Sequence, residues 1–226
     1  SGAGLNGVAA LIGAAIGYII SCGLAGSIRY LAAIVLVYTI SFAFQDTKLA
    51  SKSVFAPATA AVSALSTGIL SSFTSVFTQA PAAAVVLIET VFSFGGCWFF
   101  REAMSSRERT TESEELRYAG SVLITAAVLL MAVSQIEIFG AISLGRLAAV
   151  LVVMTCTLRC GIMTGCTIGT AFGIAMDLTA GGMPFYTMAY AFAGLLSGMF
   201  NRHGRLLFLL SFIIANAAAV TCAWAF

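Results

Sequence analysis

The chain has 226 residues, of which 60% are hydrophobic and 9% are charged, and its formal net charge is +2. A soluble domain carries about 25% charged residues, so this composition excludes an ordinary water-soluble globule. There is no basic tract, which argues against nucleic-acid binding, and no strand-like alternation, which argues against a membrane β-barrel. We therefore expect an all-α, polytopic transmembrane helical bundle, forming a single transmembrane domain over 1–226 with no soluble domain.

Nine apolar segments, taken in chain order, predict nine membrane spans. They run over 7–24, 30–44, 54–78, 81–104, 118–134, 144–158, 161–178, 184–200 and 206–225. A span needs about 20 apolar residues, and ~17 is the usual lower limit, so 30–44 and 144–158 are short. The stretch 144–178 is either one long kinked helix or two helices, and Arg159 followed by Gly161 favours a break.

Basic residues are distributed unevenly between the loops that these spans define. Nine of the eleven Lys and Arg residues fall on one side, namely Lys48, Lys52, Arg101, Arg107, Arg109, Arg117, Arg159, Arg202 and Arg205. Arg29 and Arg146 are the two that fall on the other side. Because cytoplasmic loops carry the excess of Lys and Arg, we expect Ser1 in the cytosol and Phe226 outside.

The stretch 105–117 is the one strongly hydrophilic part of the chain. Thr111 and Glu114 have the spacing of a capping box, which predicts the start of the next helix. A solvated cytosolic loop is the interpretation that we favour, and a docking surface for a cytosolic partner is the alternative. On the opposite side, Asp177 lies at a predicted helix end and marks an extracellular turn.

Glycines at four-residue spacing are the most regular feature of the chain. They are Gly161, Gly165, Gly169 and Gly173, and Gly194 and Gly198 add a second small-residue face on the following span. Such faces let helix backbones approach closely in lipid. Packing within this chain is favoured, and packing against another subunit stays open. Phe172 is expected on a different face, where leucine would be tolerated.

Glu89 is an acidic residue deep in the predicted span 81–104. An acid at the membrane centre costs ~2.5–3.5 kcal/mol on insertion scales, so its side chain should face the protein interior. No intramembrane Lys or His is present to pair with it, which favours a structural role as a hydrogen-bond donor. A proton or cation site is the functional alternative.

No catalytic residues and no metal ligands are predicted in this chain. The phosphate-binding, nucleophile-elbow and zinc-protease motifs are all absent from the sequence. Cys156 and Cys160 share a helix face, but a second pair of ligands is missing and the single histidine, His203, lies elsewhere. We expect a membrane domain that holds no cofactor.

The segments GRLAAVLVV, GIMTGCTIGTAFGIAMDL and FYTMAYAFAGLLSGMFNRHGR resemble the membrane region of the stage II sporulation protein E family. The resemblance is best over 81–226, and Glu89 matches an acid that the family carries in a span. The other matching positions are Gly165, Gly169, Gly173, Tyr186, Met188, Ala191, Phe192, Gly194, Leu195, Leu196, Gly198, Gly204 and Arg205.

The resemblance implies about ten spans, then a cytosolic regulatory segment and a metal-dependent (Mn or Mg) PP2C-type serine phosphatase domain. That phosphatase dephosphorylates an anti-sigma-factor antagonist and so activates a forespore sigma factor. The membrane region would anchor the protein at the polar division septum of a sporulating bacterium, self-associate and meet division-septum proteins. Asp46 and Asp177 are the only aspartates here, so the phosphatase's metal site, like the first two spans, is expected to lie outside this chain.

Two alternatives remain open. One is a small-solute permease that uses Glu89 and the glycine-lined helix, and the other is an unrelated structural membrane protein. If the family resemblance holds, the odd number of spans predicts a further apolar segment after Phe226, before any cytosolic domain.

Overall fold

The computed structural model describes residues 5–50, 52–74, 80–105, 111–138, 142–181 and 184–225. Within them the chain forms eight α-helices, one 3-10 helix and one two-stranded hairpin. The chain divides into two compact units, Ser1–Ser106 (unit 1) and Arg107–Phe226 (unit 2). The division falls within the hydrophilic stretch 105–117, and the single transmembrane domain over 1–226 stays a prediction.

Among the described residues, five helical segments are long and apolar enough to cross a membrane. They are Gly7–Leu24, Gly26–Ala43, Ala83–Ala103, Glu112–Ser134 and Ile162–Ala180. The chain is therefore an α-helical, multi-pass membrane protein, as predicted from its composition. Phe185–Phe200 and Arg205–Ala219 are apolar but shorter, so the count of nine spans stays a prediction.

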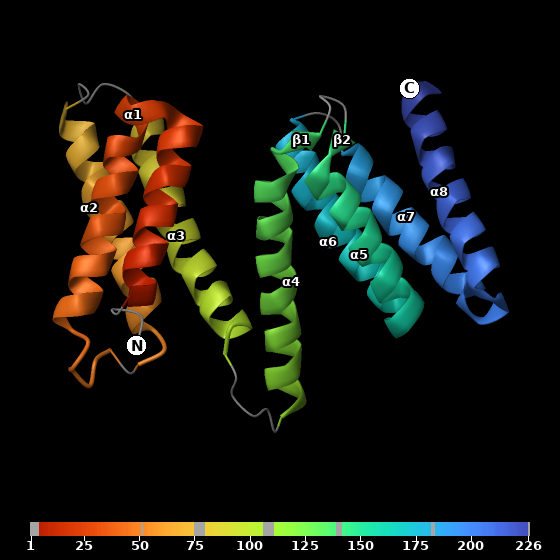
Figure 1. The fold of residues 1–226 in the computed structure, drawn as a ribbon, viewed down its shortest axis with the longest axis horizontal. Coiled ribbons are helices and arrows are strands. Elements are labelled where there is room, and N and C mark those ends of the chain that lie inside the picture. The colour runs from red at the N-terminus through yellow and green to blue at the C-terminus, as the bar shows by residue number, and fades with distance from the viewer. Residues whose placement is uncertain are drawn as a thin grey trace. The chain divides into compact units, whose positions relative to one another are not determined.

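Unit 1 consists of α1 (Leu5–Ala43), α2 (Phe55–Thr74) and α3 (Ala80–Ala103). Helix α1 folds back at Gly23, where φ is 68° and ψ is 171°. The Tyr18 and Tyr30 rings stack with centroids 4.9 Å apart, although 12 residues of straight helix would separate them by about 18 Å. The bend makes two arms, 5–22 and 24–43, which Figure 1 shows folded back on each other.

The fold-back at Gly23 corrects two predictions for this region. The second arm of α1 begins before residue 30, and Gly26–Ala43 is long enough to span. Arg29 therefore lies in a helix and not in a loop. The physical reason is that a glycine, which lacks Cβ, adopts positive φ at little cost and reverses the chain without loop residues.

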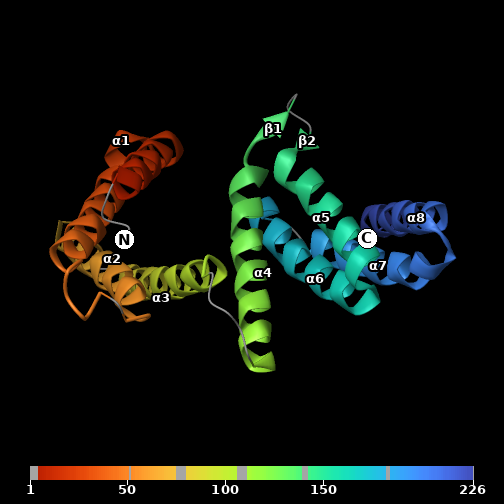
Figure 2. The same ribbon diagram turned by 60° about the horizontal axis from the view of Figure 1, so that its bottom comes forward.

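Unit 2 consists of α4 (Glu112–Ser134), a hairpin of β1 (Glu137–Ile138) and β2 (Ile142–Ser143), α5 (Leu144–Cys160), α6 (Ile162–Ala180), α7 (Phe185–Phe200), η1 (Asn201–His203) and α8 (Arg205–Ala225). Helix α7 packs against both α6 and α8, and Figure 2 shows α8 beside α7. Val153, Phe172 and Met176 are buried in a core shared by several of these helices.

The stretch 144–178 forms two helices, which confirms the break that the sequence favours. Gly161 separates α5 from α6 with φ 88°, and its N–H donates to the Thr157 carbonyl oxygen. Positive φ at this position strains any residue with a side chain. The break is therefore built into the sequence by a single glycine.

Helix α4 begins directly after Thr111, six residues before the predicted span 118–134. The position of the helix start agrees with the capping-box prediction, but the Thr111 side chain makes no capping hydrogen bond. Instead, the Glu114 N–H donates to the Thr111 carbonyl oxygen at 2.9 Å. The first turn contains Glu112, Glu114 and Glu115, whose negative charges interact favourably with the helix dipole.

Candidate functional site

The polar centre of unit 1 is an ion pair between Arg29 of α1 and Glu89 of α3. Arg29 donates through Nη2 to Glu89 Oε2, and the Tyr30 hydroxyl donates to Glu89 Oε1 at 3.2 Å. The guanidinium also lies 5.5 Å from the centroid of the Tyr30 ring. Glu89 thus has a cationic partner, which the sequence analysis missed because it placed Arg29 in a loop.

The ion pair is only partly buried within unit 1. The side chains of Arg29 and Glu89 are 23% and 29% exposed. Charges in the hydrocarbon region are costly unless they are paired or meet polar groups. Pairing offsets part of this cost, and both side chains also line a cavity.

This cavity, the unit 1 pocket, has a volume of about 480 Å³ and lies between α1, α2 and α3. Half of its lining residues carry polar groups, namely Tyr18, Arg29, Tyr30, Thr67, Glu89 and Ser93. The other half is apolar, namely Ala33, Ile34, Val37, Ala60, Ala64 and Phe92. Ligand pockets of about 300–1,000 Å³ with a few convergent polar groups are typical of small-molecule sites.

Small hydroxyl residues form the buried face of α2 beside this pocket. Thr59, Ser63 and Thr67 recur at four-residue spacing and are 7%, 1% and 7% exposed. The Thr67 hydroxyl donates to the Ser63 carbonyl oxygen at 2.8 Å. At Gly68, a Cβ would lie 2.9 Å from Arg29 Nη2, so the missing side chain admits the guanidinium. The four-residue spacing was a visible signal of this face, but the sequence analysis did not use it.

The glycines of α6 and α7 lie at the contact between these two helices, here called the α6–α7 interface. A Cβ at Gly169 would lie 2.8 Å from the Tyr190 carbonyl carbon, and one at Gly173 would lie 2.7 Å from the Thr187 nitrogen. From the other side, a Cβ at Gly194 would meet the Gly165 carbonyl oxygen at 2.6 Å. The obstacle in each case is backbone, which cannot rotate away.

Gly165 and Gly198 extend this close packing. A Cβ at Gly198 would lie 2.7 Å from the Ile162 Cα atom, and one at Gly165 would lie 2.7 Å from Thr157 Cγ2 of α5. The structure thus places these glycines in contacts within the chain. Glu89 belongs to unit 1, and these glycines belong to unit 2.

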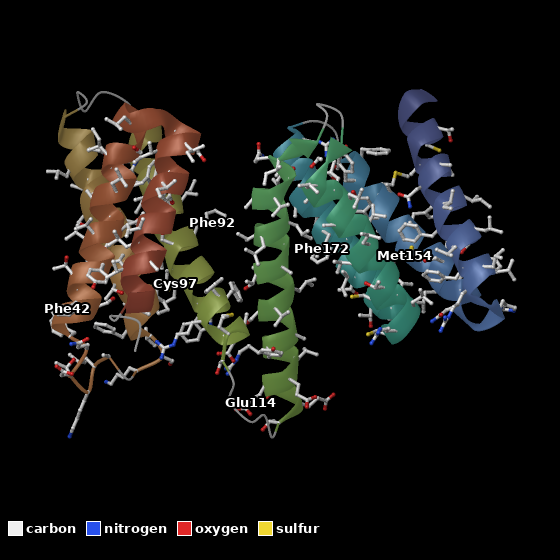
Figure 3. The ribbon with its side chains drawn as sticks, viewed as in Figure 1. Phe42, Phe92, Cys97, Glu114, Met154 and Phe172 are labelled. Atoms are coloured by element: carbon white, nitrogen blue, oxygen red, sulfur yellow. The ribbon has the colours of Figure 1, made fainter. Side chains whose placement is uncertain are left out.

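Gly161 and Phe172 differ from their predicted roles. A Cβ at Gly161 would meet nothing within 4 Å, so this glycine forms the helix break and not the packing face. Phe172 is 1% exposed and belongs to the core of unit 2; Figure 3 labels it. Leucine at Phe172 would leave a cavity, so the expected tolerance is wrong. Because α6 is contacted from several sides, a residue off the glycine face is still buried.

Asp177 connects the end of α6 to the start of α7. Its carboxylate accepts hydrogen bonds from the backbone N–H groups of Tyr186 and Thr187, both at 2.8 Å, and from the Thr187 hydroxyl at 2.5 Å. These N–H groups lie in the first turn of α7, where they have no partner within the helix. Asp177 lies at the predicted turn, and its role there is a helix cap.

Arg146 of α5 lies close to the same end of α7. Its guanidinium carbon lies 4.8 Å from the centroid of the Tyr186 ring, and the Tyr190 hydroxyl donates to its carbonyl oxygen at 3.4 Å. Arg146 is inside α5, near its first turn, and within the predicted span 144–158. A cation over an aromatic ring is a stable arrangement for such a partly buried guanidinium.

Within the part of the chain that the structure describes, no group of three or more His, Cys, Asp or Glu residues could hold a metal ion. A divalent metal of the kind that the resemblance implies does not fit any residue set described here. No protein-family model, no curated protein and no solved structure matches the chain.

Proposed function

We propose that this chain is the membrane-anchoring, septum-localising and assembly region of a sporulation PP2C-type serine phosphatase of the stage II sporulation protein E family. The phosphatase domain, with its Mn or Mg ions, belongs to the rest of the parent protein. That enzyme would activate a forespore sigma factor by dephosphorylating an anti-sigma-factor antagonist. The chain would keep this activity at the polar division septum.

The observation that carries the proposal is the clustering of the matching positions. Gly165, Gly169, Gly173 and Gly194 are among the residues shared with the family, and they meet at the α6–α7 interface. Backbone-to-backbone contact at these positions requires glycine, since a Cβ there would meet the neighbouring helix. Five candidate spans supply the anchor.

Self-association, which is part of this proposal, needs a surface other than the glycine face. The glycines of the α6–α7 interface already contact backbone within the chain. The remaining helix surfaces expose large apolar side chains such as Ile20, Phe92 and Leu178, which are 79%, 75% and 70% exposed. Copies of the chain would meet through faces of this kind.

The proposal is tested by the location of a fluorescent fusion in a sporulating bacterium. The unchanged chain and a Gly120→Leu control should concentrate at the polar septum, because a Cβ at Gly120 would meet nothing within 4 Å. Gly169→Leu should lose this pattern, since it disrupts the α6–α7 interface. Uniform labelling of the whole membrane by the unchanged chain would contradict the septal role.

The encoding gene provides an independent test. Beyond the codon for Phe226 we expect a further apolar segment of about 20 residues, followed by a cytosolic phosphatase domain. A stop codon directly after Phe226 would overturn the proposal.

A small-solute permease is the second candidate, and the unit 1 pocket beside Glu89 favours it. In this role Glu89 would bind a proton or cation, and the glycines would have no part because they are packed against backbone. Proton-coupled uptake into vesicles that disappears with Glu89→Gln would support the permease. Equal uptake by both forms would exclude a role for Glu89 in transport.

A further inference from the structure

We propose that the unit 1 pocket binds one phospholipid, whose phosphodiester oxygens accept hydrogen bonds from Arg29 and one of whose acyl chains lies along the apolar wall. The apolar wall consists of Ala33, Ile34, Val37, Ala60 and Ala64. This inference needs only a chain that spans the membrane, and it is independent of the sporulation proposal.

The first argument is the order of polar and apolar groups along the helices. Arg29 lies six residues beyond the turn at Gly23, which is about 9 Å along the helix, whereas Val37 lies about 21 Å beyond it. Helix α2 repeats this order, because Thr67 is nearer to its end at Thr74 than Ala60 is. The polar end of the pocket is therefore on the Gly23 side, and the apolar wall extends from it toward the middle of the membrane.

A phospholipid in the leaflet on the Gly23 side has the same order. Its phosphate lies at the surface and its acyl chains extend toward the midplane. The guanidinium of Arg29 lies at this end of the pocket, bonded to Glu89 and beside Gly68. The pocket is too small for a whole two-chain lipid, but its volume suits one polar group and part of one chain.

The second argument is the unused hydrogen-bonding capacity of Arg29. A guanidinium has five N–H donors, and in the described residues Glu89 is the acceptor that Arg29 reaches. The side chain is 23% exposed and lines the pocket. A hydrocarbon occupant would leave the remaining donors without acceptors, at a cost in free energy. Phosphodiester oxygens are strong acceptors, and Arg binds phosphate in a bidentate manner.

The third argument is the shape of the apolar wall. Its alanines, Ala33, Ala60 and Ala64, lie on two facing helices, α1 and α2. Small side chains on both helices leave a groove between them. Phe92, which is 75% exposed and projects from α3 (Figure 3), lines the same pocket. A pocket with such a groove and a large aromatic side chain suits a flexible hydrocarbon chain.

The experiment uses the full chain in detergent, with thermal unfolding and native mass spectrometry as readouts. Dioleoyl phosphatidylglycerol and dioleoyl phosphatidylcholine, which share the phosphodiester, should both raise Tm and remain bound. Inorganic phosphate and oleate should do neither, because each supplies one half of the recognised chemistry. A Tm increase with inorganic phosphate or oleate that equals the increase with phospholipid would overturn the proposal, and so would no increase with phospholipid.

A matched pair of variants tests the apolar wall. Ala64→Phe fills the apolar wall and keeps both members of the Arg29–Glu89 pair, and it should weaken phospholipid binding roughly tenfold or more. Val62→Phe adds the same ring to the exposed side of α2, where Val62 is 57% exposed, and should bind as the unchanged chain does. Equal binding by both variants would contradict the assignment of the acyl chain.

Photo-crosslinking of the unchanged chain gives a test that no folding defect can obscure. A phosphatidylcholine that carries a diazirine in one acyl chain should label peptides that contain 33–37 or 60–64. Labelling spread over all exposed apolar helix faces, with no excess on these peptides, would show only bulk solvation by lipid and would overturn the specific site.

Discussion

The two units differ in what their helices enclose. Unit 2 has a continuous apolar core, which includes Val153, Phe172, Met176 and Phe212, and its α6–α7 interface brings backbones into contact through glycine. Both units bury small hydroxyl side chains, such as Ser63 and Thr67 in unit 1 and Ser121 and Ser197 in unit 2. Unit 1 has no comparable apolar cluster among its described residues, and its three helices line a pocket that contains a charged pair.

This difference separates structural from functional residues. Lipid tails solvate apolar side chains as well as a protein interior does, so membrane helices associate by close packing and by polar contacts. Unit 2 combines glycine packing with neutral and capping polar contacts, whereas unit 1 places an ion pair between α1 and α3. A partly exposed ion pair beside a pocket is a more expensive arrangement than glycine packing, and for this reason we place the candidate site in unit 1.

The largest effect that we expect is on unit 2, from Gly169→Leu. The new side chain would meet the Tyr190 backbone, which cannot move without separating α6 from α7. Inserting a larger side chain into a packed core typically costs about 1–3 kcal/mol, and the loss of stability here should be greater than that. Gly120→Leu, which adds the same side chain in open space, is the control. Thermal unfolding and size-exclusion chromatography in detergent measure both, and equal behaviour of the two variants would remove the distinction between the units.

The ion pair of unit 1 should show strong coupling between its two members. Arg29→Leu or Glu89→Leu alone leaves one charge without its partner in the membrane, and should destabilise by less than the about 3–5 kcal/mol seen for fully buried pairs, because both groups are partly exposed. The double variant should be more stable than either single variant. Additive losses in a double-mutant cycle would show that the pair contributes no coupling to unit 1.

The cap of α7 should contribute less than either of these features. Asp177→Ala removes the acceptor of two backbone N–H groups and of the Thr187 hydroxyl. A lost N-terminal cap costs about 0.5–2 kcal/mol. Asp46→Ala, at the chain's other aspartate, should change stability less when both variants are unfolded by heat. A larger loss of stability with Asp46→Ala than with Asp177→Ala would show that the aspartate of unit 1 contributes more, which would contradict this ranking.

Single cysteines introduced for labelling should leave stability unchanged. They report the membrane orientation of both units. On a background without the six native cysteines, Lys48→Cys in unit 1 and Arg117→Cys in unit 2 should react only from the cytosol. Ile136→Cys, at an exposed position after α4, should react only from outside. Labelling of Arg117→Cys from outside intact cells would contradict the predicted orientation.

Each unit by itself shows the alternation that this orientation requires. In unit 1 the Gly23 turn lies at one end and the turns after Ala43 lie at the other, as Figure 1 shows. In unit 2 the strands β1 and β2 lie at the end opposite to the α5–α6 break. The nine apolar segments of the sequence correspond to the two arms of α1 and to α2–α8. Their crossing of a bilayer is what the labelling tests.

The membrane class, the positions of the helices, the break at Gly161 and the small-residue spacing of α6 and α7 follow from the sequence by itself. They depend on local composition and periodicity, which a short window of residues contains. The partner of Glu89 was decided only by the tertiary structure, because Arg29 is 60 residues away and reaches it only after α1 folds back at Gly23. The burial of Phe172, the pocket and the division into two units likewise depend on how whole helices pack. Each is a property of contacts between distant segments, and no local pattern records them.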